Sequence, residues 1–292
     1  KNVARGKLFL ILFLVLGFYS CSKEEDNTLK ISPNSHIVLV GNNLGSRMLN
    51  FGHFETEMQL RFPNDSLYIR NMCDGGNTPG FRPHSARNSP WAFPGAEKFE
   101  HESGEAVHFE DDENGGRSGP IGHFPSPDEW ITSLKADIII GFFGYPESFE
   151  GPDGIDNYKG ELRAFIKHTL SQKYNGSTPP QLALVSPIAF EDLSDKMDLP
   201  DGKKENGNLE LYTAAMKEVA AEEGVLLVDA YEPTKEWYQT ESADLTQDGF
   251  QLNDFGYQKF AKLLADKVFG TKENVAEANR ELVLDAVNEK NW

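Results

Sequence analysis

Short apolar runs alternate along most of the chain with longer stretches in which apolar residues recur every three or four positions. The short runs are rich in β-branched residues and have few polar positions, which is typical of strands buried on both faces of a parallel sheet. The longer stretches have the periodicity of amphipathic helices. Five strands are therefore expected, at residues 36–40, 67–70, 137–143, 182–186 and 225–229.

Helices are expected between and after these strands, at residues 46–62, 155–173, around 209–219 and around 257–268. This alternation predicts an α/β fold, a three-layer sandwich with a five-stranded parallel sheet in the middle. No internal repeat or second domain boundary interrupts residues 36–270. The carboxyl ends of the strands then meet at one edge of the sheet, where ligand sites assemble.

Regularity fails between residues 79 and 127, where prolines, glycines and an acidic cluster replace any periodic pattern. A connection this long is either a functional lid or a partly disordered loop. It contains side chains that bind metals in other proteins, but their spacing matches no ligand pattern of a helix or hairpin. A solvated loop is therefore favoured, and neither a metal nor another cofactor is expected. These side chains are His84, His101, His108, Asp111, Asp112 and His123.

Residues 1–21 have the pattern of a signal peptide, because a positively charged start precedes an apolar run of about 12 residues, too short to span a bilayer. Small residues then lead to Cys21, and this pattern resembles the lipobox of bacterial lipoproteins, whose cysteine is lipidated after cleavage. The acidic stretch 22–26 resembles the export signal of surface lipoproteins in Bacteroidetes-type bacteria. These resemblances imply a protein of the bacterial cell envelope, lipid-anchored in the outer membrane or at the cell surface. The plainer alternative is a cysteine beside a cleaved signal.

The composition is that of an ordinary globular protein, with 39% hydrophobic and 25% charged residues. The formal net charge of −18 argues against a nucleic-acid partner, because phosphates need a basic surface. Cys73 is the only cysteine besides Cys21, so a lipidated Cys21 excludes an intramolecular disulfide. Polar residues 22–35 are expected to form a tether. Residues 271–292 start a further helical pattern without a stop signal, and we expect a truncated segment leading to a downstream domain.

Four strand ends carry polar, glycine-rich turns on the carboxyl edge of the predicted sheet. The most specific phrase is Leu-Thr-x-Asp-Gly-x-x-Leu-Asn-x-x-Gly-Tyr at 245–257. The others are Gly-Asn-Asn-Leu at 41–44, Asn-x-x-x-Gly-Gly-Asn-Thr at 71–78 and Gly-Tyr-Pro-Glu-Ser-Phe at 144–149. Together they resemble the four sequence blocks of the SGNH hydrolases, the GDSL-like esterases, in their bacterial surface-lipoprotein form. The resemblance covers about residues 35–270 and implies the flavodoxin-like fold of that family.

In that family a serine of the first block attacks an ester carbonyl, a histidine of the last block takes its proton, and an aspartate orients the histidine. A glycine and an asparagine help to form the oxyanion hole. By position, Asn43 replaces the serine, Gln251 the histidine and Pro146 the oxyanion asparagine, whereas Gly76 and Asp248 are retained. An amide neither forms an ester intermediate nor accepts a proton near neutral pH, so the standard mechanism does not operate.

Side chains near the four turns are candidate substitutes, and each also has a plainer structural interpretation. Ser46 is either a nucleophile or a residue that caps the first helix, and the second role is favoured. Ser148 is either a nucleophile or an ordinary turn hydroxyl. Glu147 and Asp248 either activate a water together or shape their turns. A histidine of the segment 79–127 is a candidate base.

Three functions remain open from the sequence. The first is an ester hydrolase that acts on acyl or acetyl esters of carbohydrates through a non-standard site. The second is a non-catalytic module that binds a glycan in the same cleft. The third is a scaffold domain within a longer lipoprotein. A small ester or carbohydrate is the expected ligand of the first two, and membrane contact is expected only through the lipid anchor.

Overall fold

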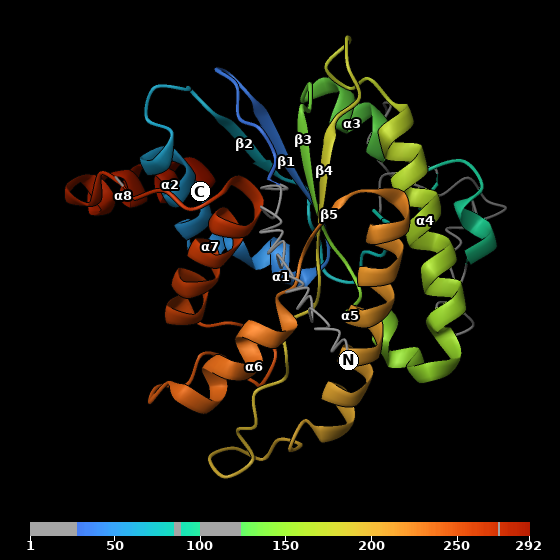
Figure 1. Cartoon of the computed structure of the whole chain (residues 1–292), viewed down its shortest axis with the longest axis vertical. Coiled ribbons are helices and arrows are strands. Elements are labelled where there is room, and N and C mark those ends of the chain that lie inside the picture. The colour runs from blue at the N-terminus through green and yellow to red at the C-terminus, as the bar shows by residue number, and fades with distance from the viewer. Residues whose placement is uncertain (1–27, 85–88, 100–123, 274) are drawn as a thin grey trace, which may run out of the picture.

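The computed structural model describes residues 28–84, 89–99, 124–273 and 275–292 (Figure 1). The predicted signal peptide, Cys21 and the first part of the expected tether lie outside these residues. Most of the histidine-rich segment also lies outside them, including His101, His108 and His123, together with Asp111 and Asp112. Within the described part of the chain, every helix is too short or too polar to cross a membrane.

Five parallel strands form one sheet in the order β2-β1-β3-β4-β5, which confirms the predicted α/β fold. This is the flavodoxin-like order, in which the chain direction across the sheet reverses between β1 and β3. Register pairs Leu39 with Asn71 on one side and with Ile140 on the other. The strands are β1 (His36–Gly41), β2 (Tyr68–Asn71), β3 (Ile138–Phe142), β4 (Gln181–Val185) and β5 (Leu226–Val228).

Helices cover both faces of the sheet, so the central strands β1, β3 and β4 are apolar at consecutive positions rather than at alternate ones. In β1, Ile37 and Leu39 face one core cluster, whereas Val38 and Val40 face the other, and none is more than 2% exposed. The first cluster lies under α2 (His53–Arg61) and α7 (Asp254–Phe269). The second lies under α3 (Pro127–Ser133), α4 (Ile155–Ser171) and α5 (Lys203–Glu223) (Figure 1). The helix α6 (Tyr231–Thr240) follows β5.

The helix predicted at 46–62 is instead three shorter elements. They are α1 (Asn43–Ser46), the 3₁₀ helix η1 (Arg47–Asn50) and α2. The break falls at Gly52, whose φ is +66°, and that value leaves the right-handed helical region. A Cβ at Gly52 would lie 2.4 Å from Oδ1 of Asn288, so the last helix of the chain packs directly on this glycine. The prediction of one continuous helix was therefore wrong.

Residues 28–35 do not form a free tether but dock on the domain. The amide of Leu29 donates to the carbonyl of Val268 at 2.8 Å, and the Lys30 amide donates to Gln181 at 2.7 Å. Leu29 and Ile31 pack against the first core cluster. Residues 28–35, the second part of the expected tether, are thus held against the domain by backbone hydrogen bonds and by the contacts of two apolar side chains.

Residues 271–292 also pack on the same domain. They contain the 3₁₀ helix η4 (Glu277–Asn279) and α8 (Arg280–Asn291), which lies against α2 (Figure 1). Val287 is buried at 5% exposure, and Arg280 pairs with Glu57 of α2 at 2.8 Å. This helical segment is thus an additional outer element of the α/β domain.

The described parts of the irregular segment 79–127 are ordered against α4. Phe81 and Trp91 form an isolated antiparallel bridge, and the 3₁₀ helix η2 (Ala96–Phe99) follows. Glu161 of α4 accepts hydrogen bonds from the Thr78 hydroxyl at 2.6 Å and from the Gly80 amide at 2.9 Å. The beginning of the segment is therefore part of the packed structure rather than a solvated loop.

Candidate functional site

The site lies at the carboxyl ends of β1 and β3, where the strand order reverses. Gly41 ends β1 with φ +121°, and a Cβ there would lie 2.1 Å from the carbonyl oxygen of Phe142. The amide of Asn42 donates to that same oxygen at 2.9 Å. Only glycine fits this close approach of two strands, and the turn after β1 is thereby fixed beside the end of β3.

The turn after β1 presents two amide side chains, those of Asn42 and Asn43. Asn42 is buried and caps α1, because its Oδ1 accepts from the Leu44 amide at 3.2 Å. Asn43 is the first residue of α1, is half-buried and lines the site. Ser46 lies at the end of α1, does not line the site and makes no side-chain capping bond, so the expected capping role belongs to Asn42.

The second glycine-rich turn approaches the first but leaves Gly76 at its outer side. The amide of Asp74 donates to the carbonyl of Gly41 at 2.9 Å, which joins the two turns. Gly76 is exposed, has φ +79° and has open space around it. It does not line the small cavity at the site.

The third turn buries two of the candidate substitutes. Glu147 is only 2% exposed, and its Oε2 accepts from the Gly144 amide at 2.9 Å. Burial, followed by the charge of Glu161, raises the pKa of Glu147 well above its ordinary value. Ser148 is 4% exposed, and its hydroxyl donates to the carbonyl of Tyr145 at 2.7 Å. Both side chains shape the turn, and neither lines the cavity.

The last block places Asp248 and Gln251 in one tight turn. The Oδ1 atom of Asp248 accepts from the amides of Phe250 at 3.2 Å and Gln251 at 2.8 Å. The Gln247 amide closes the loop with a bond to the Gln251 carbonyl at 2.8 Å. The Asp248 carboxylate thus holds the backbone of its own turn.

Buried Glu191 anchors this loop, although the sequence analysis did not single it out. Its carboxylate accepts from the amides of Leu245 and Thr246 and from the Thr246 hydroxyl, at 2.6–3.1 Å. Its own amide donates to the carbonyl of Gly249 at 2.7 Å. The only sequence signal was its position after β4, which brings it to the same sheet edge.

Aromatic rings nearly fill the space between these turns. Tyr145 and Phe250 stack with their ring centroids 5.0 Å apart, and both line a cavity of only about 20 Å³. Such a volume holds about one water molecule. Burial, then the charge of Asp248, raises the pKa of the Tyr145 hydroxyl, so this group stays neutral. Asn43 and Gln251 line the same cavity, which confirms that the two turns meet.

Two further polar residues line the cavity and were not predicted from the sequence. Ser186 is buried, and its hydroxyl donates to the Pro187 carbonyl at 3.0 Å while it accepts from the Ala230 amide at 2.9 Å. Arg47 donates through Nη2 to Gln247 at 3.2 Å, whereas its buried Nε has no acceptor among the described residues. The Ser186 hydroxyl is thus occupied by backbone hydrogen bonds. Arg47 places a positive charge on one side of the cavity.

The described histidines all lie away from the cavity. His36 bonds the carbonyl of Leu134, His53 pairs with Asp254, His84 stacks on a phenylalanine, and His168 pairs with an aspartate. The described residues also contain no group of three or more histidine, cysteine or acidic side chains suited to a metal ion. The described side chains that line the cavity therefore include amides, one guanidinium and aromatic rings, and no histidine or carboxylate.

No protein-family model and no curated protein matches the sequence. Solved structures do resemble the fold. A catalytic mutant of the acetylxylan esterase Axe2 from Geobacillus stearothermophilus is 14% identical, with a TM-score of 0.54 over 84% of this chain and 100% of that one. A putative GDSL-like lipase from Parabacteroides merdae is 12% identical, with a TM-score of 0.54 over 82% of this chain and 98% of that one.

A gut microbial diltiazem-metabolizing enzyme is similar over 83% of this chain and 48% of its own, at 14% identity and a TM-score of 0.54. The neighbours share the α/β, three-layer fold of the SGNH, GDSL-like esterases, which confirms the fold that the sequence blocks imply. At 12–14% identity, the similarity to these structures extends to the fold and not to the residues of the site.

Proposed function

We propose that the protein is a non-hydrolytic carbohydrate-binding module built on the esterase fold, which binds acetylated glycans at the former catalytic edge. One observation carries the proposal. Asn43 and Gln251 occupy the positions of nucleophile and base and line one cavity, and no described histidine accompanies them.

Physical chemistry makes serine-type hydrolysis a poor alternative for this site. Loss of such a triad costs on the order of 10⁶ in kcat, and loss of an oxyanion donor costs a further factor of about 10²–10³. Pro146 has no N–H to donate at the oxyanion position. Glu147 is buried and Asp248 is bound within its turn, so these two carboxylates are poorly placed to activate a shared water.

Exposed aromatic rings beside the cavity support a sugar ligand. Phe149 is 69% exposed and stands edge-on to Tyr145, with ring centroids 5.3 Å apart. Tyr145 in turn stacks on Phe250. Such a platform offers apolar faces to the C–H groups of a sugar ring. The cavity is too small to admit the sugar, so Arg47 and the two amides would offer hydrogen bonds to hydroxyl or acetyl oxygens at its mouth. Acetylxylan, the substrate named for several structural neighbours, is the ligand class to test first.

The test is calorimetric titration of the protein with acetylated xylo-oligosaccharides, combined with an NMR assay for released acetate. We expect binding without acetate release. Phe149→Ala should weaken binding at least fivefold, because it removes the exposed stacking face. Leu282→Ala is the matched control, since Leu282 is a similarly exposed apolar residue on α8.

Two results would contradict this proposal in different ways. Acetate release that Asp248→Ala abolishes would establish an ester hydrolase with a non-standard site. Absence of binding to acetylated and deacetylated sugars alike would leave the scaffold hypothesis as the better one.

We also propose that Cys21 is lipidated and anchors the protein in the bacterial cell envelope, at the outer membrane or cell surface. The signal-like pattern of residues 1–21 and the acidic stretch after it support this. The test is metabolic labelling with an alkyne fatty acid in a Bacteroidetes host. Cys21→Ser should abolish the label and release the protein from the membrane fraction, and an unchanged label would refute the anchor.

A further inference from the structure

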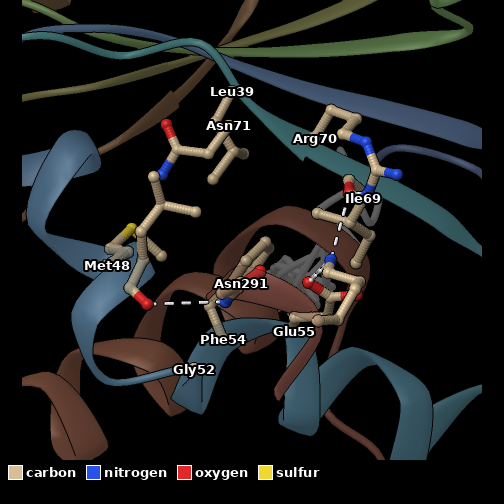
Figure 2. Close-up of a pocket in the computed structure, with 11 residues that line it drawn as sticks. Leu39, Met48, Gly52, Phe54, Glu55, Ile69, Arg70, Asn71 and Asn291 are labelled. Atoms are coloured by element: carbon tan, nitrogen blue, oxygen red, sulfur yellow. Dashed lines mark hydrogen bonds and ion pairs between the residues drawn. The ribbon is translucent and has the colours of Figure 1, made fainter. Parts of the chain in front are cut away.

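A larger pocket, of about 350 Å³, shares no lining residue with the candidate site. It opens along β2, the outermost strand of the sheet, and is closed below by η1, α2 and α8 (Figure 2). The proposed glycan site makes no use of it. Its volume falls within the range of small-molecule sites, about 300–1,000 Å³.

Apolar side chains form the inner wall of this pocket. Leu39 and Ile69 of the sheet face Met48 and Phe54 of the helical layer (Figure 2). All four are less than 8% exposed, so the wall is a continuation of the core rather than a surface patch. A ligand with a compact apolar body would bury that body here.

Two cationic side chains converge at the mouth of the pocket. Nη1 of Arg70 donates to the carbonyl of Ile69 at 3.1 Å, and Nζ of Lys290 lies 3.5 Å from the same oxygen. The Arg70 guanidinium also lies 4.3 Å from the ring centroid of Tyr68, which fixes its plane. Two positive groups thus share one neutral acceptor, at the free edge of β2.

One carboxylate offsets only part of this positive charge. Glu55 pairs with Lys290, and their side chains are 13% and 35% exposed. The guanidinium of Arg70 makes no hydrogen bond to the described residues other than the one to Ile69, so most of its five N–H donors remain available. In a chain of net charge −18, a pocket mouth with two cations and one anion is a local exception that attracts anions.

We propose that this pocket binds a small organic carboxylate with a compact apolar body. The carboxylate is held by the free donors of Arg70 and by Lys290, and the apolar body lies between the sheet and α2. A planar, two-pronged guanidinium suits a carboxylate, because both ligand oxygens are satisfied at once. The ligand class differs from the glycan proposed for the first site, and the two proposals are independent.

Calorimetric titration of the whole protein with hexanoate and 3-phenylpropionate tests this inference. The neutral amides of the same acids, hexanamide and 3-phenylpropanamide, are the matched ligands. We expect binding of the acids and at least tenfold weaker binding of the amides. Equal affinity for acid and amide, or no binding of either acid at about 10 mM, would overturn the proposal.

Substitutions at the pocket mouth should change the affinity for the acids in opposite directions, depending on the charge that is removed. Arg70→Gln and Lys290→Gln should each weaken binding of the acids at least tenfold. Glu55→Gln should strengthen it severalfold, because it removes the carboxylate that competes for Lys290. Arg163→Gln, which removes a surface arginine of α4 paired with Glu222, is the control and should change nothing.

Circular dichroism and thermal unfolding show whether each variant is folded. A Glu55→Gln protein that is folded and binds the acids more weakly, or an Arg70→Gln protein that binds them unchanged, would also overturn the assignment.

Discussion

Glu147 shows how a single buried residue at this sheet edge acquires an unusual protonation state. Its Oε2 accepts the Gly144 amide, whereas its buried Oε1 has no hydrogen-bond partner among the described residues. Burial and the nearby Glu161 carboxylate both favour the neutral acid, which raises the pKa of Glu147. The folded protein therefore binds this proton more tightly than the unfolded chain does.

The raised pKa of Glu147 makes the stability of the protein depend on pH. A raised pKa in the folded state stabilises the protein fully below the ordinary pKa of 4.5, and this contribution is lost as pH rises through the raised value. We expect Glu147→Gln to gain stability relative to the natural protein as pH increases from about 4.5 to about 8. Urea denaturation across this range measures the difference.

A matched variant separates this effect from general surface charge. Glu218→Gln alters a surface carboxylate of α5 whose side chain is 54% exposed, and its stability should run parallel to that of the natural protein. A stability difference between Glu147→Gln and the natural protein that is independent of pH would show that Glu147 titrates normally.

The motifs predict residues whose place is set by local sequence, and they miss residues whose role depends on contacts between distant parts of the chain. Asn43 and Gln251 could be placed in one site, because block spacing and the common sheet edge locate their backbones. The role of Glu191 could not be predicted, because its hydrogen bonds join it to a loop more than fifty residues away. The raised pKa of Glu147 depends in the same way on α4, through the charge of Glu161.

At the scale of elements, the loop 245–253 depends on one carboxylate for its shape. Four hydrogen bonds to Glu191 replace the regular backbone pairing that a strand or helix would supply. Glu191→Ala should lower the free energy of unfolding by about 3–5 kcal/mol, because it leaves two buried amides and a hydroxyl without an acceptor.

Urea denaturation measures this loss, and hydrogen exchange at the Phe250 and Gln251 amides reports the loop directly. Glu236→Ala removes an exposed carboxylate of α6 and should change stability by no more than about 0.5 kcal/mol. If Glu191→Ala is as stable as that control, the loop is held by other contacts.

The elements themselves were predicted well where the pattern was local. All five strands occur at the expected places, and for most of them a short apolar run between turns left little alternative. The helix at 46–62 was predicted as one piece, since the sequence does not reveal that Gly52 adopts a positive φ. That break is fixed by Asn288 and Val287 of α8, which contact Gly52 from far along the chain.

At the scale of the molecule, one charge cluster joins three helices. Arg61 of α2 is nearly inaccessible and donates to Glu57 at 2.6 Å and to Asp266 of α7 at 2.7 Å. Arg280 of α8 donates to the second oxygen of Glu57 at 2.8 Å. The packing of α8 on α2 was not predicted, because the sequence pattern of α8 indicates a helix but not the surface on which that helix packs.

Arg61→Met should destabilise the protein by about 3–5 kcal/mol, because it leaves the buried Glu57 carboxylate with a single partner. Arg280→Met should cost about 1 kcal/mol, since the Arg280 side chain is 27% exposed and Glu57 keeps Arg61. Chemical denaturation of both variants measures the ratio. Equal losses in the two variants would show that α8, rather than the pair within α2, carries the cluster.

The stack of Tyr145 on Phe250 has a consequence for attempts to introduce hydrolysis at this site. Asn43→Ser and Gln251→His together would supply a hydroxyl and an imidazole, yet the cavity of about 20 Å³ that the stacked rings line has no room for an acyl group. Pro146 would still have no N–H to donate. The double variant is therefore not expected to hydrolyse esters unless the stack is opened as well.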